Sequence, residues 1–129
     1  MCHQTVSLVA RHLEANGIST VIVGSARDIV EHCGVPRFLF TDFPLGNSCG
    51  RPWEVEMQRR IVGHALDLLE SATGPRTTVQ APLLWSEDPS WKEGYARINP
   101  SQAENLRRAG ETRRAIQERL KSEGKARSD

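Results

Sequence analysis

The stretch from residue 18 to residue 41, ISTVIVGSARDIVEHCGVPRFLFT, decides the fold of this chain. Its first part, 18–23, is rich in β-branched side chains and is typical of a strand. A short helix is expected over 26–33, and a second apolar strand over 37–41. Because a strand, a helix and a strand follow one another through short connections, the stretch indicates a parallel sheet covered by helices.

Residues of special conformation mark the helix ends around this stretch. Ser25 is predicted to be the N-cap of the short helix, Gly34 is predicted to close it, and Pro36 prevents its continuation. Before the first strand, apolar positions at helical spacing predict an amphipathic helix over 4–16, which Gly17 stops in a left-handed conformation.

The chain after the second strand alternates irregular and regular segments. The segment 42–53, DFPLGNSCGRPW, holds prolines and glycines and is expected to be a loop at the carboxyl end of a strand. A long amphipathic helix follows over 54–72. A third strand is predicted within 77–84, where Pro82 restricts it to an edge position or to part of that length.

We therefore expect an α/β domain over 1–84, with a small and partly incomplete parallel sheet flanked by helices, like half of a Rossmann-like or flavodoxin-like fold. Residues 85–129 are expected to be an excursion anchored by aromatic side chains and a C-terminal helix, both packed on that domain. Such a fold normally has a strand before the first helix, and this sequence has none there. The sheet is therefore expected to be completed by another chain or by an upstream half-chain.

Composition excludes several functions. A chain of 129 residues with 38% apolar side chains supports one core, and its formal net charge of +1 gives no field to attract nucleic acid or a membrane. The apolar runs fall short of the roughly 20 residues that a bilayer span needs. No secretory signal is visible, so a cytoplasmic location is expected. The basic excess of 101–129 is read as a solvated helix face, with an RNA or partner contact as the alternative.

The three cysteines carry the candidate chemistry. Cys2 lies where the first helix begins, and unpaired N–H groups there favour a thiolate; the alternative is a disordered residue without a role. His3 is expected to point away from Cys2. Cys33 is expected to be a small buried apolar residue. Cys49 lies in a polar loop near Arg51 and is either a reactive thiol or a loop residue without function. No C-x-x-C spacing occurs, so neither a zinc site nor a dithiol motif is supported. No cofactor is expected.

Two parts of the sequence resemble a known family. They are CHQTV at 2–6 and LEANGISTVIVGSARDIVEHCGVPRFLFTDFPLGNSCGRP at 13–52. Together they are similar to the carboxyl-terminal half of the selenoprotein B group of glycine, sarcosine, betaine and D-proline reductases. The more specific matches are the strand entry at 16–21, the PLG loop at 44–46 and the G-x-P that follows at 50–52.

The resemblance implies a reductase subunit that cleaves a carbon–nitrogen bond of an amino-acid-like substrate, with Cys2 as the nucleophile and Cys49 as a candidate redox partner. It implies that Gly46, Asn47 and Arg51 bind substrate, with Arg51 holding a carboxylate. Other reductase subunits and an oligomeric state are expected. This sequence contains no selenocysteine, and the strand expected before the nucleophile is missing. We therefore expect either a shortened gene product whose true start lies upstream or a degenerate relative. The alternatives are a non-catalytic assembly subunit and an anion sensor at the turn before the second helix.

Overall fold

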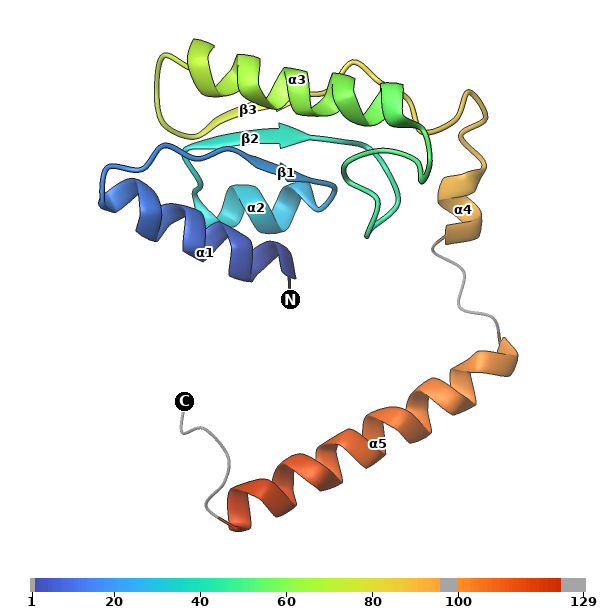
Figure 1. The fold of residues 1–129 in the computed structure, drawn as a ribbon. Coiled ribbons are helices and arrows are strands. Elements are labelled where there is room, and N and C mark those ends of the chain that lie inside the picture. The colour runs from blue at the N-terminus through green and yellow to red at the C-terminus, as the bar shows by residue number, and fades with distance from the viewer. Residues whose placement is uncertain (1, 96–99, 124–129) are drawn as a thin grey trace. The chain divides into compact units, whose positions relative to one another are not determined.

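The computed structural model describes residues 2–95 and 100–123 of the chain (Figure 1). The chain forms two compact units, Met1–Trp91 and Lys92–Asp129. The elements are, in chain order, α1 (Cys2–Ala15), β1 (Ile22–Gly24), α2 (Arg27–Cys33), β2 (Arg37–Phe40), α3 (Val55–Ser71), β3 (Thr77–Gln80), α4 (Trp91–Tyr95) and α5 (Pro100–Ser122).

The first unit is built on a three-stranded parallel sheet with the strand order β1-β2-β3. Ile22 pairs with Phe38, and Phe38 pairs with Thr78. Each parallel connection passes through a helix, with α2 between the first two strands and α3 between the last two. Figure 1 shows α3 on one face of the sheet and α1 with α2 on the other. This small α/β fold with an additional C-terminal helix is the predicted one.

Alternation along β2 divides the core into two layers. Phe38 and Leu39 are both buried, and because neighbouring side chains of a strand point to opposite faces, each belongs to a different layer. Leu39 packs in the layer under α3, with Phe43, Met57, Ile61, Ala65, Leu68 and Ala81. Phe38 packs in the layer under α1 and α2, with Ala10, Ile22, Val30 and Val35.

The first strand is shorter than predicted, because its expected beginning makes other contacts. The backbone N–H of Ile18 donates to the carbonyl oxygen of Leu13, and both the N–H and the hydroxyl of Thr20 donate to the Glu14 carboxylate. These donors are unavailable to a strand ladder, so β1 begins only at Ile22.

The prediction that Ser25 caps α2 is wrong. Ala26 holds the N-cap position, and no side chain there bonds to the backbone of the first turn. The Ser25 hydroxyl instead lies 3.3 Å from that of Thr41 and 3.1 Å from that of Ser48. The predicted end is confirmed, since Gly34 has a left-handed φ of 69° and its N–H bonds within the last turn.

The third strand ends where proline predicts. β3 is an edge strand, and Ala81 still donates its N–H to Phe40 before Pro82, which has no N–H to donate. Beyond it, the Trp85 ring lies 5.6 Å from that of Phe43 and 6.4 Å from that of Trp91. These contacts anchor the segment that leaves the sheet.

The second unit contains α5, on which Ile116 and Leu120 are 52% and 39% exposed. Packing of residues 85–129 on the α/β domain stays a prediction. The sequence also predicts a frayed end over 124–129 and a packing contact of the Tyr95 side chain, and both fall outside the part of the chain that the structure describes. Among the described helices, none has the length and apolar character to cross a membrane.

Candidate functional site

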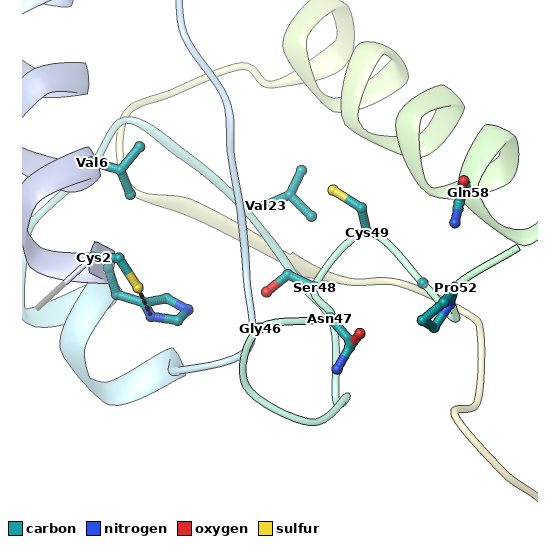
Figure 2. Close-up of a pocket in the computed structure, with 11 residues that line it drawn as sticks. Cys2, Val6, Val23, Gly46, Asn47, Ser48, Cys49, Pro52 and Gln58 are labelled. Atoms are coloured by element: carbon teal, nitrogen blue, oxygen red, sulfur yellow. Dashed lines mark hydrogen bonds between the residues drawn. The ribbon is translucent and has the colours of Figure 1, made fainter.

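A pocket of about 450 Å³ opens at the edge of the sheet where β1 and β2 end (Figure 2). Parallel strands place their carboxyl ends at one edge, and α/β folds commonly bind ligands there. Four segments form the walls: the start of α1, the end of β1, the loop that leads to α3 and the first turn of α3. The lining residues are Cys2, His3, Val6, Val23, Gly46, Asn47, Ser48, Cys49, Gly50, Pro52 and Gln58.

The start of α1 is fixed against the end of β1. The Ser7 hydroxyl donates to the carbonyl oxygen of His3 at 2.6 Å, one turn earlier in the helix. The His3 ring in turn accepts the backbone N–H of Ser25 through Nε2 at 3.3 Å. These contacts hold the first turn of α1, including Cys2, at the pocket.

Three hydroxyl groups connect the pocket loop to the sheet. Ser25 follows β1, Thr41 follows β2, and Ser48 lies in the loop, and the Ser25 hydroxyl is within hydrogen-bond distance of the other two. Thr41 is fully buried and donates its backbone N–H to Gly24 at 2.9 Å. The cluster therefore fixes Ser48 relative to both strand ends.

The loop itself consists of successive tight turns. Asn47 donates its N–H to Pro44 and Gly50 donates to Asn47, each at 3.0 Å. Gly46 and Gly50 have φ values of +91° and +107°, a conformation that glycine adopts without a steric cost. The turns bring Gly46 and Asn47, two of the three predicted substrate-binding positions, to one wall of the pocket.

The structure brings together most of the residues predicted from sequence. Cys2 from α1 and Cys49 from the loop are both exposed and line the same pocket, as do Gly46 and Asn47. Figure 2 shows Cys2 on the α1 side and Cys49 on the loop that leads to α3. Cys33 is only partly buried and lies away from this pocket.

Arg51 is placed differently from the other predicted residues. It is not among the residues that line the pocket. Its Nη1 atom lies 2.7 Å from a carboxylate oxygen of Glu54, and its carbonyl oxygen accepts a hydrogen bond from Gln58. Carboxylate binding by Arg51 stays a prediction, and it requires the Glu54 pair to open.

Sequence reasoning missed the role of His3 in this pocket. The expectation that His3 points away from Cys2 is wrong, because its Nδ1 atom lies 3.7 Å from the Cys2 sulfur. The binding of its other nitrogen to Ser25 turns the ring toward the cysteine. Ser48 and Gln58 were also missed. Ser48 is the neighbour of Cys49 in the sequence, and this position was the signal that could have found it. Nothing in the sequence indicated Gln58.

The pocket offers thiols and hydrogen-bond donors with little formal charge. Among the described residues that line it, none is a Lys, Arg, Asp or Glu. Such a site can support a sulfur nucleophile and hold a small polar ligand through amide and hydroxyl groups. Over residues 2–95 and 100–123, no three His, Cys, Asp or Glu side chains are grouped so that they could hold a metal ion.

Comparison with known proteins finds a similarity to a reductase subunit. D-proline reductase subunit gamma from Acetoanaerobium sticklandii is 34% identical over 68 residues. The chain is similar to a reductase subunit. The match covers 53% of this chain and 28% of the relative, so the chain spans little more than a quarter of the relative's length. This similarity supports a relationship to the reductases in general and does not single out the selenoprotein B group. No family model and no solved structure matches the chain.

Proposed function

We propose that this chain is a subunit or part of a reductase of the selenoprotein B type, which cleaves a carbon–nitrogen bond of an amino-acid-like substrate with Cys2 as its thiolate nucleophile. The observation that carries the proposal is that Cys2, Cys49, Gly46 and Asn47 line the same pocket. The similarity to a D-proline reductase subunit supports the reaction class.

The chemistry proceeds in two displacements. The Cys2 thiolate attacks the carbon that carries an activated nitrogen; a carbon–sulfur bond forms, and the nitrogen leaves with the electron pair of the broken bond and gains a proton. A second thiolate, from Cys49 or from a partner subunit, then attacks the Cys2 sulfur. A disulfide forms, and the released carbon takes an electron pair and a proton. An external dithiol reduces the disulfide and completes the cycle.

Selective alkylation tests the reactivity of Cys2. Cys2 and Cys49 are both exposed, so accessibility alone would give similar rates for the two. If Cys2 is held as a thiolate, iodoacetamide near pH 7 should label it at least about tenfold faster than Cys49, followed site by site through peptide mass spectrometry. Denaturation should make the rates of all three cysteines equal.

Equal labelling of Cys2 and Cys49 in the folded protein would contradict the proposal. A second experiment measures the reductive cleavage of D-proline with dithiothreitol, in the presence of the other subunits of the proposed reductase. It compares the unsubstituted chain with the Cys2→Ser and Cys49→Ser variants. Cleavage should be lost in Cys2→Ser and reduced in Cys49→Ser. Full activity of Cys2→Ser would exclude Cys2 as the nucleophile.

A second candidate function, a non-catalytic assembly subunit, is favoured by a separate observation. Trp53, the last residue of the loop 42–53, is 96% exposed and has a positive φ of 69°. Leu8 and Val9 on α1 are 52% and 50% exposed. Tryptophan is enriched in binding hot spots, and larger exposed apolar patches mark interaction sites.

Solution behaviour tests the assembly function. Sedimentation velocity should reveal an oligomer or a complex with the other reductase subunits, and Trp53→Ala should weaken it without changing alkylation of Cys2. A stable monodisperse monomer that binds none of those subunits would count against this function.

A further inference from the structure

The His3 ring is held at both of its nitrogen atoms. Its Nε2 accepts the backbone N–H of Ser25 at 3.3 Å, and its Nδ1 lies 3.7 Å from the Cys2 sulfur, a length suited to the large sulfur atom. The dashed line at Cys2 in Figure 2 marks this second contact. The two contacts link a helix start to a strand end through one imidazole.

The backbone partner decides which nitrogen carries the proton. A peptide N–H can only donate, so the nitrogen that faces Ser25 must present a lone pair. In a neutral imidazole the single proton then sits on the other nitrogen, Nδ1, which faces Cys2. The Cys2 sulfur is therefore the acceptor of that contact.

We propose that His3 is a positioning residue, held by Ser25 in the Nδ1–H tautomer, which donates a hydrogen bond to the Cys2 sulfur and does not act as its base. This inference deepens the proposed function and rests on it for the role of Cys2. A sulfur anion is a better acceptor than a thiol, so the contact stabilises the thiolate. The proton of Cys2, an exposed residue, leaves to water.

Gly24 gives the ring the space it needs. A Cβ atom at this position would lie 3.1 Å from Cδ2 and 3.3 Å from Nε2 of His3, and 3.3 Å from a ring carbon of Phe38. Phe38 is buried in the core and cannot move away, so a side chain here would displace the imidazole. An alanine at position 24 therefore tests the ring position without altering His3 or Cys2.

Nitrogen NMR of the full chain reads the tautomer directly. In protein labelled with ¹⁵N and measured near pH 8, Nδ1 of His3 should have the shift of a protonated nitrogen and Nε2 that of an unprotonated one. Gly24→Ala should move both shifts toward the average of the two tautomers. Protonated Nε2 with unprotonated Nδ1 in the unsubstituted protein would overturn the inference, whether or not Cys2 proves to be a nucleophile.

Two substitutions separate hydrogen bonding from shape. His3→Asn keeps an N–H donor close to the place of Nδ1, and His3→Phe keeps a ring without a donor. Near pH 7, alkylation of Cys2 should stay within about threefold of the unsubstituted rate in His3→Asn and fall about tenfold in His3→Phe. Near pH 10 the rates should converge, because an ordinary cysteine thiol, with a pKa of about 8.5, is ionised at that pH without a hydrogen-bond donor.

The rate for Cys49 and the circular dichroism spectrum serve as internal controls for folding. Equal rates in His3→Phe and the unsubstituted protein near pH 7 would contradict the positioning role. A loss that persists unchanged near pH 10 would also contradict it, because it would indicate a general structural effect. A failure of the proposed reductase activity, in contrast, would leave the tautomer measurement intact.

Discussion

At the scale of single residues, the carboxylate of Glu14 joins three segments of the chain. One oxygen accepts hydrogen bonds from the backbone and hydroxyl of Thr20 and from Nη1 of Arg37, the last at 2.8 Å. Burial raises the pKa of Glu14, but the Thr20 hydrogen bonds and the Arg37 charge outweigh burial and hold the pKa below its ordinary value. The charged form therefore stabilises the junction of α1 with β1 and β2.

Glu14→Gln should lower the free energy of unfolding by about 1–2 kcal/mol at pH 7. A carboxyl group whose pKa is lower in the folded state stabilises the protein above the pKa of the unfolded chain. That stabilisation is lost as the pH falls from about 4.3 through the folded pKa. Urea unfolding at pH 7 and near pH 2.5 should show the difference between the two proteins shrinking toward zero.

Glu31→Gln is the matched control for this prediction. The Arg27–Glu31 pair is also short, at 2.9 Å, but its side chains are 55% and 38% exposed. Its removal should cost less than about 0.5 kcal/mol at any pH. A similar loss in the free energy of unfolding for both variants would contradict the larger contribution expected from Glu14.

At the scale of elements, the pocket loop is attached to α3 through Gly50. This residue is buried and has a φ of +107°, and a Cβ here would lie 3.3 Å from Met57 Cγ and from Ile61 Cδ1. Ile61 is fully buried and Met57 is nearly so, so neither can yield easily. The loop can therefore approach α3 closely only because Gly50 has no side chain.

Gly50→Ala should destabilise the protein by about 2–3 kcal/mol, through backbone strain and crowding against α3. Gly46→Ala is the control, since φ at Gly46 is +91° but a Cβ there would meet nothing within 4 Å. It should cost about 1 kcal/mol, the effect of the conformation alone. Thermal and urea unfolding would measure both, and an equal cost would show that the contact with α3 is unimportant.

At the scale of the whole molecule, charges are balanced locally as well as in total. The formal net charge is +1, and on α5 Arg107 lies 2.9 Å from Glu104 and 3.6 Å from Glu111. Arg119 likewise lies 2.8 Å from Glu123. The tail contains more basic than acidic residues, which would create a positive field around α5. The ion pairs reduce that field.

The chain should therefore not bind duplex DNA or single-stranded RNA at micromolar concentration in 150 mM salt, as measured by fluorescence anisotropy. The double variant Glu104→Gln/Glu111→Gln frees Arg107 and should gain weak binding that disappears as salt is raised. Micromolar binding by the unsubstituted protein at this salt concentration would support the RNA alternative instead.

The local parts of this structure were predictable because neighbouring residues determine them. The β-branched run before Gly24, the left-handed Gly34 and the proline that limits the third strand each act within a few residues. The carboxyl-end position of the pocket loop also followed, since parallel strands end at one edge. For the same reason Cys49 could be named as a candidate from the sequence, whereas Cys2 was named for its place at a helix start and Asn47 through the family resemblance.

The partners of individual side chains depended on the tertiary structure. Ser25 was expected to cap a helix, but its hydroxyl faces Thr41 and Ser48; His3 was expected to point away from Cys2, but Ser25 turns its ring. The order and type of the elements were predictable from the amino-acid sequence, because they follow from local backbone preferences and apolar spacing. Only the folded chain decided which polar groups meet, because those contacts join residues that are distant in sequence and depend on packing to within a fraction of an ångström.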